Sequence, residues 1–229
     1  IRDQPRSRGL GDVYKRQLSI KRNSLDNGGP EIILASKSQV RSRLLKGAGV
    51  NFFVHPPDVD EAVIKKNAGN ASTKKLARIL AEAKARQVSY HFTDALVIGA
   101  DQVLECQGGF FDIPTGKMAA REHLMKLRGK THHLTCSVCV AQKGEIIWCE
   151  TDRADMTMLN FSNDFVEYYL EKTGESIQAS VGAYQLEDIG IQLFESIKGN
   201  YFTILGLPLL PLLGFLRTKT VSYTHLRAH

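Results

Sequence analysis

Apolar positions in the first half of the chain predict strands that alternate with amphipathic helices. A β-branched run at Ile32–Leu34 is followed by a helical pattern through Leu44, and a second apolar run covers 51–54. Helical spacing returns over Thr73–Val88, and Leu96–Ile98 is another buried strand. The inward face of the longer helix is predicted to carry Leu76, Leu80, Ala83 and Gln87, with Ile79 beside them. This alternation indicates an α/β fold.

The second half of the chain predicts antiparallel pairing. A helix over 115–128 precedes three strands at 133–140, 146–149 and 154–160. A helix capped by Ser162 and a short terminal helix that ends at Arg217 complete the pattern. We therefore expect one α/β domain with an elongated mixed sheet flanked by helices, and no internal repeat.

Composition and length fit one globular domain. The 229 residues are 43% hydrophobic and 24% charged, and no apolar run approaches the length of a membrane span. Residues 1–30 lack the apolar core of a secretory signal. We expect a cytoplasmic protein that does not associate with membranes.

The net charge of +6 lies in the two ends of the chain. Residues 1–30 hold seven Lys and Arg against three Asp and Glu, and 218–229 hold two against none, so 31–217 is balanced at 21 of each sign. Both ends lack sustained periodicity, and GDVYKRQ and VSYTHLRAH resemble adapter read-through. We predict a domain at 31–217 between disordered or non-native extensions, and no nucleic-acid partner.

Four cysteines are present, and two of them form a CxxC at Cys136 and Cys139. No second CxxC or histidine pair stands at zinc spacing. We therefore expect all four cysteines to be free thiols, mostly buried, in a reducing compartment.

A strand that leads into a helix suggests a phosphate site at its junction. Ser36, Ser38 and Arg41 follow the first strand within two turns, where free backbone N–H groups favour an anion. Lys37 and Arg43 lie nearby. The alternative is that Ser38 only caps the helix and that the basic side chains are solvated.

Carboxylates suggest a metal site. Asp58, Asp60 and Glu61 lie in a predicted loop, and Asp101 is expected at the carboxyl end of a strand. Mg²⁺ is usually held by one or two carboxylates together with substrate phosphates. Lys84, near the end of the long helix, would add a cation. The alternatives are that the acidic groups and Lys84 are simply solvated.

Five motifs in one order resemble the Maf family of nucleoside triphosphate pyrophosphatases. They cover about residues 31–217 and read LASxSxxR, DVDE, EAKA, IGADQ and VGAY…G…LFE.I.G.Y..I.GLPL. The resemblance implies two lobes around a central cleft, commonly a dimer, and hydrolysis of a nucleoside triphosphate to the monophosphate and pyrophosphate with a divalent metal, Mg²⁺ or Mn²⁺.

The resemblance also implies residue roles. Ser36 and Arg41 would bind the triphosphate, with Ser38 in the same motif, and Lys84 would contact a phosphate. Glu61 and Asp101 would lie at the metal, and Asp101 would be the proton acceptor. Whether Asp101 acts as a base or mainly as a ligand stays open.

Two positions bear on the preferred base. Family members that act on dTTP or UTP carry other residues at the positions of Gln102 and Glu187. The residues found here are similar to those of the branch that acts on methylated guanosine triphosphates or a broader set. A carboxylate can accept hydrogen bonds from a guanine edge.

One position departs from the family pattern. The motif GKP or DKP is Asp112-Ile113-Pro114 here, so a lysine is missing, and Lys117 lies in the next predicted helix. Ile113 either faces the cleft or packs into the core. Ile113 and the basic total charge leave a second hypothesis, a nucleotide- or nucleic-acid-binding cell-division regulator with little or no turnover.

Overall fold

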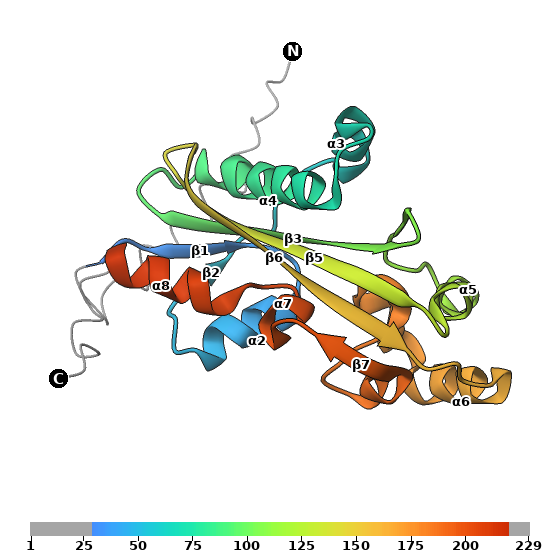
Figure 1. The fold of residues 1–229 in the computed structure, drawn as a ribbon. Coiled ribbons are helices and arrows are strands. Elements are labelled where there is room, and N and C mark those ends of the chain that lie inside the picture. The colour runs from blue at the N-terminus through green and yellow to red at the C-terminus, as the bar shows by residue number, and fades with distance from the viewer. Residues whose placement is uncertain (1–28, 220–229) are drawn as a thin grey trace, which may run out of the picture.

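The structure is a computed structural model that describes residues 29–219, and it is built on one mixed seven-stranded sheet (Figure 1). The strand order is β2-β1-β3-β5-β6-β7, with β4 paired to β3. Strands β2, β1 and β3 run parallel, and every other pair is antiparallel. The strands are β1 (Ile32–Ala35), β2 (Phe53–Val54), β3 (Leu96–Cys106), β4 (Gly109–Phe111), β5 (Thr131–Gln142), β6 (Glu145–Met158) and β7 (Phe194–Lys198).

Helices cover both faces of this sheet. In Figure 1, α4 lies across one face of the long strands, while α2, α7 and α8 lie on the other. Helices α5 and α6 and the 3₁₀ turns gather at the far end, beside β7. The helices are α2 (Gln39–Gly47), α3 (Glu61–Ala68), α4 (Thr73–Ser89), α5 (Lys117–Leu127), α6 (Asn163–Thr173), α7 (Tyr201–Ile204) and α8 (Leu209–Lys219), with 3₁₀ turns η1 (Gly174–Ala179), η2 (Val181–Ala183) and η3 (Ile189–Leu193).

Two large apolar cores lie at opposite ends of the long strands. One packs β1, α2 and α8 against β3, β5 and Trp148 of β6, around residues such as Leu34, Ile98 and Leu212. The other packs α5, α6 and the 3₁₀ turns against the same long strands, around Leu104 and Tyr169. Strands β3 and β5 contribute buried residues to both cores. The two cores therefore belong to one α/β domain, as predicted.

Helix α4 approaches β3 unusually closely because both elements carry small residues at the contact. Ala77, Ala81 and Ala85 are fully buried on one side of the helix, and Gly99 faces them from the strand. A Cβ atom at Gly99 would lie 2.4 Å from the Ala81 carbonyl oxygen and 2.6 Å from the Ala85 backbone nitrogen. Because these neighbours are backbone atoms, no side-chain rotation can make room.

Gly99→Ala should therefore force α4 away from the sheet. Overpacking of this kind costs roughly 1–3 kcal/mol, which is about 3–10 °C in melting temperature for a domain of this size. The matched control is Gly47→Ala, because nothing lies within 4 Å of a Cβ at that helical position. Thermal unfolding measures both, and equal melting temperatures for the two variants would contradict the tight contact.

Several element boundaries differ from those predicted. The runs at 146–149 and 154–160 belong to one continuous strand, β6, and the strand at 96–98 continues to Cys106. The loop expected around Glu61 is the helix α3, which begins where Asp60 accepts a hydrogen bond from the Val63 N–H at 3.0 Å. The terminal extensions predicted at 1–30 and 218–229 lie almost entirely outside the described residues, although α8 reaches Lys219.

The expectation of four free thiols is wrong for two of them. Cys139 and Cys149 are directly opposite each other on β5 and β6, with Cα atoms 4.1 Å apart, and they form a disulfide. Cys106 and Cys136 are free and buried. The CxxC spacing concealed this pairing, because residues three apart on a strand point to opposite faces of the sheet.

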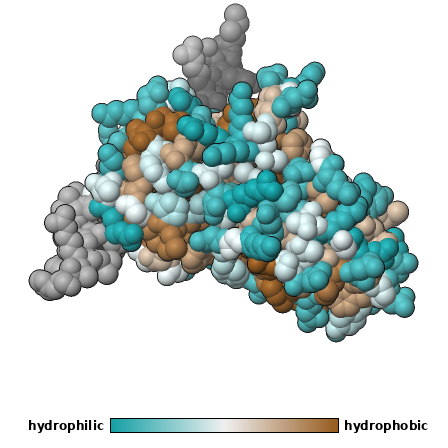
Figure 2. Space-filling model, viewed as in Figure 1, coloured by the Kyte–Doolittle hydropathy of each residue, from teal (hydrophilic) through white to brown (hydrophobic). Residues whose placement is uncertain are grey.

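One face of the molecule is predominantly polar. On the face shown in Figure 2, hydrophilic side chains cover most of the molecule and apolar ones gather in small separate patches. Within residues 29–219, every helix is too short or too polar to cross a bilayer.

Candidate active site

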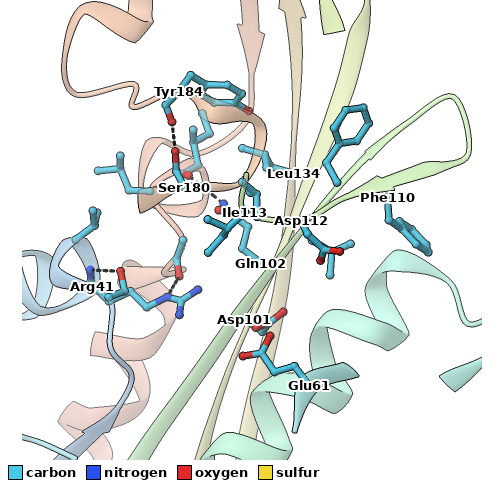
Figure 3. A pocket seen from close by; sticks show the side chains of 18 of the residues that line it. Arg41, Glu61, Asp101, Gln102, Phe110, Asp112, Ile113, Leu134, Ser180 and Tyr184 are labelled. Atoms are coloured by element: carbon cyan, nitrogen blue, oxygen red, sulfur yellow. Dashed lines mark hydrogen bonds between the residues drawn. The ribbon is translucent and has the colours of Figure 1, made fainter. Parts of the chain in front are cut away.

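A cavity of about 590 Å³ lies between the two ends of the sheet and brings together most of the predicted site residues. It is bordered by α2, α3 and α4 on one side and by β4, η2 and α7 on the others. Figure 3 shows Arg41, Glu61, Asp101 and Gln102 among the residues that line it, with Ile113 in the middle of the view. This volume suits a small-molecule substrate. We refer to the cavity below as the cleft.

Lys84 joins two carboxylates at one end of the cleft. Its Nζ lies 2.5 Å from Asp101 Oδ1 and 2.8 Å from Glu61 Oε1. The Lys84 side chain is only 9% exposed, so the alternative of a solvated lysine on the helix surface is wrong. The helix places it there because Lys84 lies eight residues after Leu76 and four after Leu80, on the buried face.

Asp101 is placed differently from the prediction. It lies in the middle of β3, opposite Ser137 of β5, rather than at the end of a strand. Burial raises the pKa of the Asp101 carboxyl, although the neighbouring charges of Lys84 and Arg41 act in the opposite direction. A carboxylate that is buried, fixed by a strand and still in contact with the cleft is well suited to accept a proton.

Of the three acidic residues after β2, only Glu61 lines the cleft. Asp60 is used as the cap of α3, and the backbone N–H of Asp58 donates to the Gln87 side chain at 3.2 Å. Figure 3 shows the Glu61 and Asp101 carboxylates facing one another. The solvated alternative therefore fits Asp58 and Asp60 better than Glu61.

The predicted phosphate site is partly assembled. Ser38 caps α2 by accepting a hydrogen bond from the Arg41 N–H at 3.4 Å, and Ser38 and Arg41 both line the cleft. Arg41 Nε donates to the Gly206 carbonyl at 2.7 Å, and Arg41 Nη1 donates to Ser36 Oγ at 3.2 Å. Ser36 is buried and does not line the cleft; it orients Arg41 from behind. Ser38 therefore caps α2 and lines the cleft at the same time.

Gln102 and Glu187 both border the cleft, but on different elements. Gln102 Nε2 donates to the carbonyls of Thr203 and Ile204 at 3.0 Å, which ties β3 to α7. Glu187, between η2 and η3, accepts from Arg43 Nη2 at 3.3 Å. The Arg43 side chain is 67% exposed, so water screens this ion pair. Glu187 remains available to a ligand.

A buried pair of rings supports the wall of the cleft near η2. Tyr184 lines the cleft, and its hydroxyl lies 2.7 Å from His132 Nε2. Burial lowers the pKa of His132 to about 4, with a smaller contribution from His133. His132 is therefore neutral near pH 7 and acts as a packing partner of Tyr184 rather than as a cation for a phosphate.

Ile113 lines the cleft and is 52% exposed, so the alternative that it packs into the core is wrong. Its neighbour Asp112 forms an ion pair with Lys65 of α3. The sequence argument missed Lys65. Its spacing was the available signal, because residues four apart on a helix share a face and Lys65 follows Glu61 by four. Lys117 is exposed on α5 and does not line the cleft.

Glu61 and Asp101 fit a hard divalent cation. Their oxygens both reach the same ammonium group, so they converge on one point of positive charge at the edge of the cleft. Mg²⁺ needs only one or two carboxylates when phosphates and water complete its shell. A different cluster of three possible ligands, formed by Glu82, Cys139 and Cys149, lies outside the cleft, and its two sulfurs are joined to each other.

Comparison with known proteins shows the family of the chain. The family described as Maf-like protein matches residues 31–219. A nucleoside triphosphate pyrophosphatase of Paramagnetospirillum magneticum is 49% identical over 187 residues, 81% of this chain and 96% of the relative. A 7-methyl-GTP pyrophosphatase of Rhizobium etli is 43% identical over 190 residues, 82% of this chain and 96% of the relative. A protein of the same name from Rhizobium meliloti is 44% identical over the same length and shares.

Proposed function

This chain belongs to the family of Maf-like proteins, and we propose that its cleft hydrolyses a nucleoside triphosphate to the monophosphate and pyrophosphate. The observation that carries the proposal is the group Glu61–Lys84–Asp101 beside Arg41 in one cleft. It combines a buried base with cations for phosphate oxygens. The regulator hypothesis offers no explanation for a carboxylate held in this way.

In the proposed reaction, water cleaves the bond between the α- and β-phosphates. The water oxygen bonds to phosphorus, the phosphoanhydride bond breaks, and the water proton passes to Asp101. Because Asp101 is fixed by β3 and contacts Lys84 at 2.5 Å, it is held in position before the substrate arrives. No covalent intermediate on the protein is needed.

Arg41 and Lys84 stabilise the negative charge that grows on the phosphoryl oxygens. The Arg41 guanidinium is oriented by Gly206 and Ser36, and these contacts leave it further donors for a phosphate. The Lys84 ammonium group need not move far, since a phosphate oxygen can replace or join the carboxylates that surround it. Both cations act without large movement, which favours the transition state.

We propose that Mg²⁺ or Mn²⁺ is the cofactor and that Glu61 and Asp101 hold it. When bound, the ion would supply positive charge to the phosphates and lower the pKa of a bound water. The four acidic residues that line the cleft outnumber its three basic ones, so a divalent cation would offset this excess of negative side chains beside the phosphates. The acidic residues are Glu61, Asp101, Asp112 and Glu187, and the basic ones are Arg41, Lys65 and Lys84.

For the substrate we propose a 7-methylated guanosine triphosphate. Two relatives carry the name 7-methyl-GTP pyrophosphatase. Methylation at N7 gives the purine ring a positive charge, and Glu187 offers a carboxylate at the border of the cleft. The same carboxylate can accept the N–H groups of the guanine edge. Gln102 shapes the neighbouring wall.

The full chain should release pyrophosphate and the nucleoside monophosphate, in the presence of Mg²⁺ or Mn²⁺, from a panel of 7-methyl-GTP, GTP, dTTP and UTP. We expect kcat/KM for 7-methyl-GTP to exceed that for GTP by about tenfold, the value of one well-placed charge interaction. Glu187→Gln should remove most of this ratio. Glu195→Gln, on the exposed face of β7, is the matched control.

The outcomes separate two claims. Release of only single phosphate, or no release from any nucleotide, would contradict the pyrophosphatase. Pyrophosphate release at equal kcat/KM from GTP and 7-methyl-GTP would contradict only the preferred base.

We further propose a cytoplasmic homodimer whose working domain is 31–217 and which needs no nucleic-acid partner. The resemblance implies the dimer, and the balanced charge of 31–217 argues against a nucleic-acid partner. The Cys139–Cys149 disulfide is unusual for a reducing compartment, so titration of the thiols after unfolding tests the cytoplasmic proposal: four reactive thiols support it and two contradict it. Light scattering and salt-dependent DNA binding test the dimer and the nucleic-acid partner.

A further inference from the structure

We propose that Lys65 is a phosphate-binding residue of the cleft and that a substrate phosphate displaces Asp112 from its ammonium group. The proposal rests on the proposed function, because it names a further residue of the same site. Neither the motifs nor the relatives' names assign a role to Lys65.

The first argument is that Lys65 is the least committed cation of the cleft. Among the described residues, three basic side chains line it. Lys84 is shared by two carboxylates at 2.5 and 2.8 Å, and Arg41 is bound to a buried hydroxyl and a carbonyl. The ion-pair partner of Lys65 is Asp112, whose side chain is 77% exposed. An ion pair so accessible to water is weak, so a multiply charged phosphate can displace the carboxylate.

The second argument is position. Lys65 lies four residues after Glu61 on α3, so both side chains project from one face of the helix toward the cleft. Partial burial alone would lower the pKa of Lys65, but contact with Asp112 and the charges of Glu61 and Asp101 raise it. Lys65 is therefore charged at neutral pH and lies within the field of the two carboxylates.

The third argument is the residue that follows Asp112, the ion-pair partner of Lys65. Ile113 follows Asp112 and lines the same wall with an apolar side chain that is 52% exposed (Figure 3). This segment therefore gives the cleft no positive charge of its own. The side chain that brings positive charge to this wall is instead Lys65 of α3, through its ion pair with Asp112.

Lys65→Met tests the role directly in the full chain. A charge-assisted hydrogen bond to phosphate accounts for roughly tenfold to a hundredfold in kcat/KM, and we expect the loss mainly in KM because the phosphate is already charged in the ground state. Affinity for inorganic tripolyphosphate, measured by calorimetry, should fall in parallel. Lys66→Met is the matched control, because Lys66 is the next residue of α3, is exposed and does not line the cleft.

Two more variants distinguish binding from a structural role. If Lys65 serves the substrate, Asp112→Asn should lower KM by about twofold to fivefold, since it removes a competing anion. Adding Ile113→Lys to Lys65→Met should restore most of kcat/KM, because it returns one positive charge to the same wall. If Lys65 merely ties α3 to the 112–114 segment, Asp112→Asn should be as damaging as Lys65→Met and Ile113→Lys should not restore it.

That second pattern would overturn the proposal, as would an unchanged kcat/KM and tripolyphosphate affinity in Lys65→Met. Melting temperatures of all variants show whether a loss reflects unfolding. If the wild-type chain binds tripolyphosphate but releases no pyrophosphate from any nucleotide, the proposed function fails while the assignment of Lys65 is still decided by the calorimetric comparison.

Discussion

Asp101→Asn should lower kcat by about a hundredfold or more, the contribution of a positioned general base. The amide keeps the shape of the side chain but accepts protons far less readily. The variant should stay folded, with a melting temperature within about 4 °C of wild type, which corresponds to about 1–2 kcal/mol for a domain of this size. Lys84 keeps a charged partner in Glu61, and burial already disfavours the ionised form of Asp101.

The control is the same substitution elsewhere on the sheet. Asp155 lies on β6, outside the cleft, where it pairs with Arg153 and His133. Asp155→Asn should leave turnover near the wild-type value. If Asp101→Asn also turns over normally in a pyrophosphate-release assay, Asp101 is not the base.

Lys84→Met should have the second large effect, and it should act on stability as well as rate. Removing the ammonium leaves Glu61 and Asp101 facing each other without a cation, and breaking a buried pair in this way costs roughly 3–5 kcal/mol. The figure is an upper estimate here, because Glu61 is half-exposed and Asp101 can take up a proton. We expect kcat/KM to fall by about a hundredfold or more, because a cation for the transition state is lost.

The effect of Mn²⁺ on melting temperature gives a second test of the Lys84→Met variant. With no ammonium between the carboxylates, Mn²⁺ should raise the melting temperature of Lys84→Met more than that of wild type. Lys74→Met, at an exposed position of the same helix, should behave as wild type in both measurements. A Mn²⁺ response that is no larger in Lys84→Met than in wild type would argue against Glu61 and Asp101 as the metal ligands.

Much of the fold could be predicted because hydrophobic spacing determines which face of each element is buried. The predicted face of α4 was nevertheless shifted. Ala83 and Gln87 are only partly buried, whereas Ala81 and Ala85 are fully buried. Gly99 lets the helix backbone come so close to β3 that only small side chains fit between them. Close approach between two elements is not visible in either element alone.

Motifs and local patterns predicted the residues of the site. The prediction missed contacts that join distant parts of the chain. The helical pattern did place Lys84 near the end of α4, but only the β3 strand and α3 show that it is buried between carboxylates. Lys65 and Asp112 are 47 residues apart. The Cys139–Cys149 disulfide likewise depends on the register of β5 with β6. Register and long-range pairing arise from the whole sheet.

Helix α3 differs from the rest of the site in how it is anchored. None of its residues is fully buried, and only Ile64 and Ala68 pack, partly buried, against a small apolar cluster with α4. Asp101 and Lys84, by contrast, belong to a central strand and to a helix that is packed tightly on it. Segments with few buried contacts open at the lowest free-energy cost. We therefore expect Glu61 and Lys65 to shift more easily than Asp101, the proposed proton acceptor, when a substrate enters or leaves.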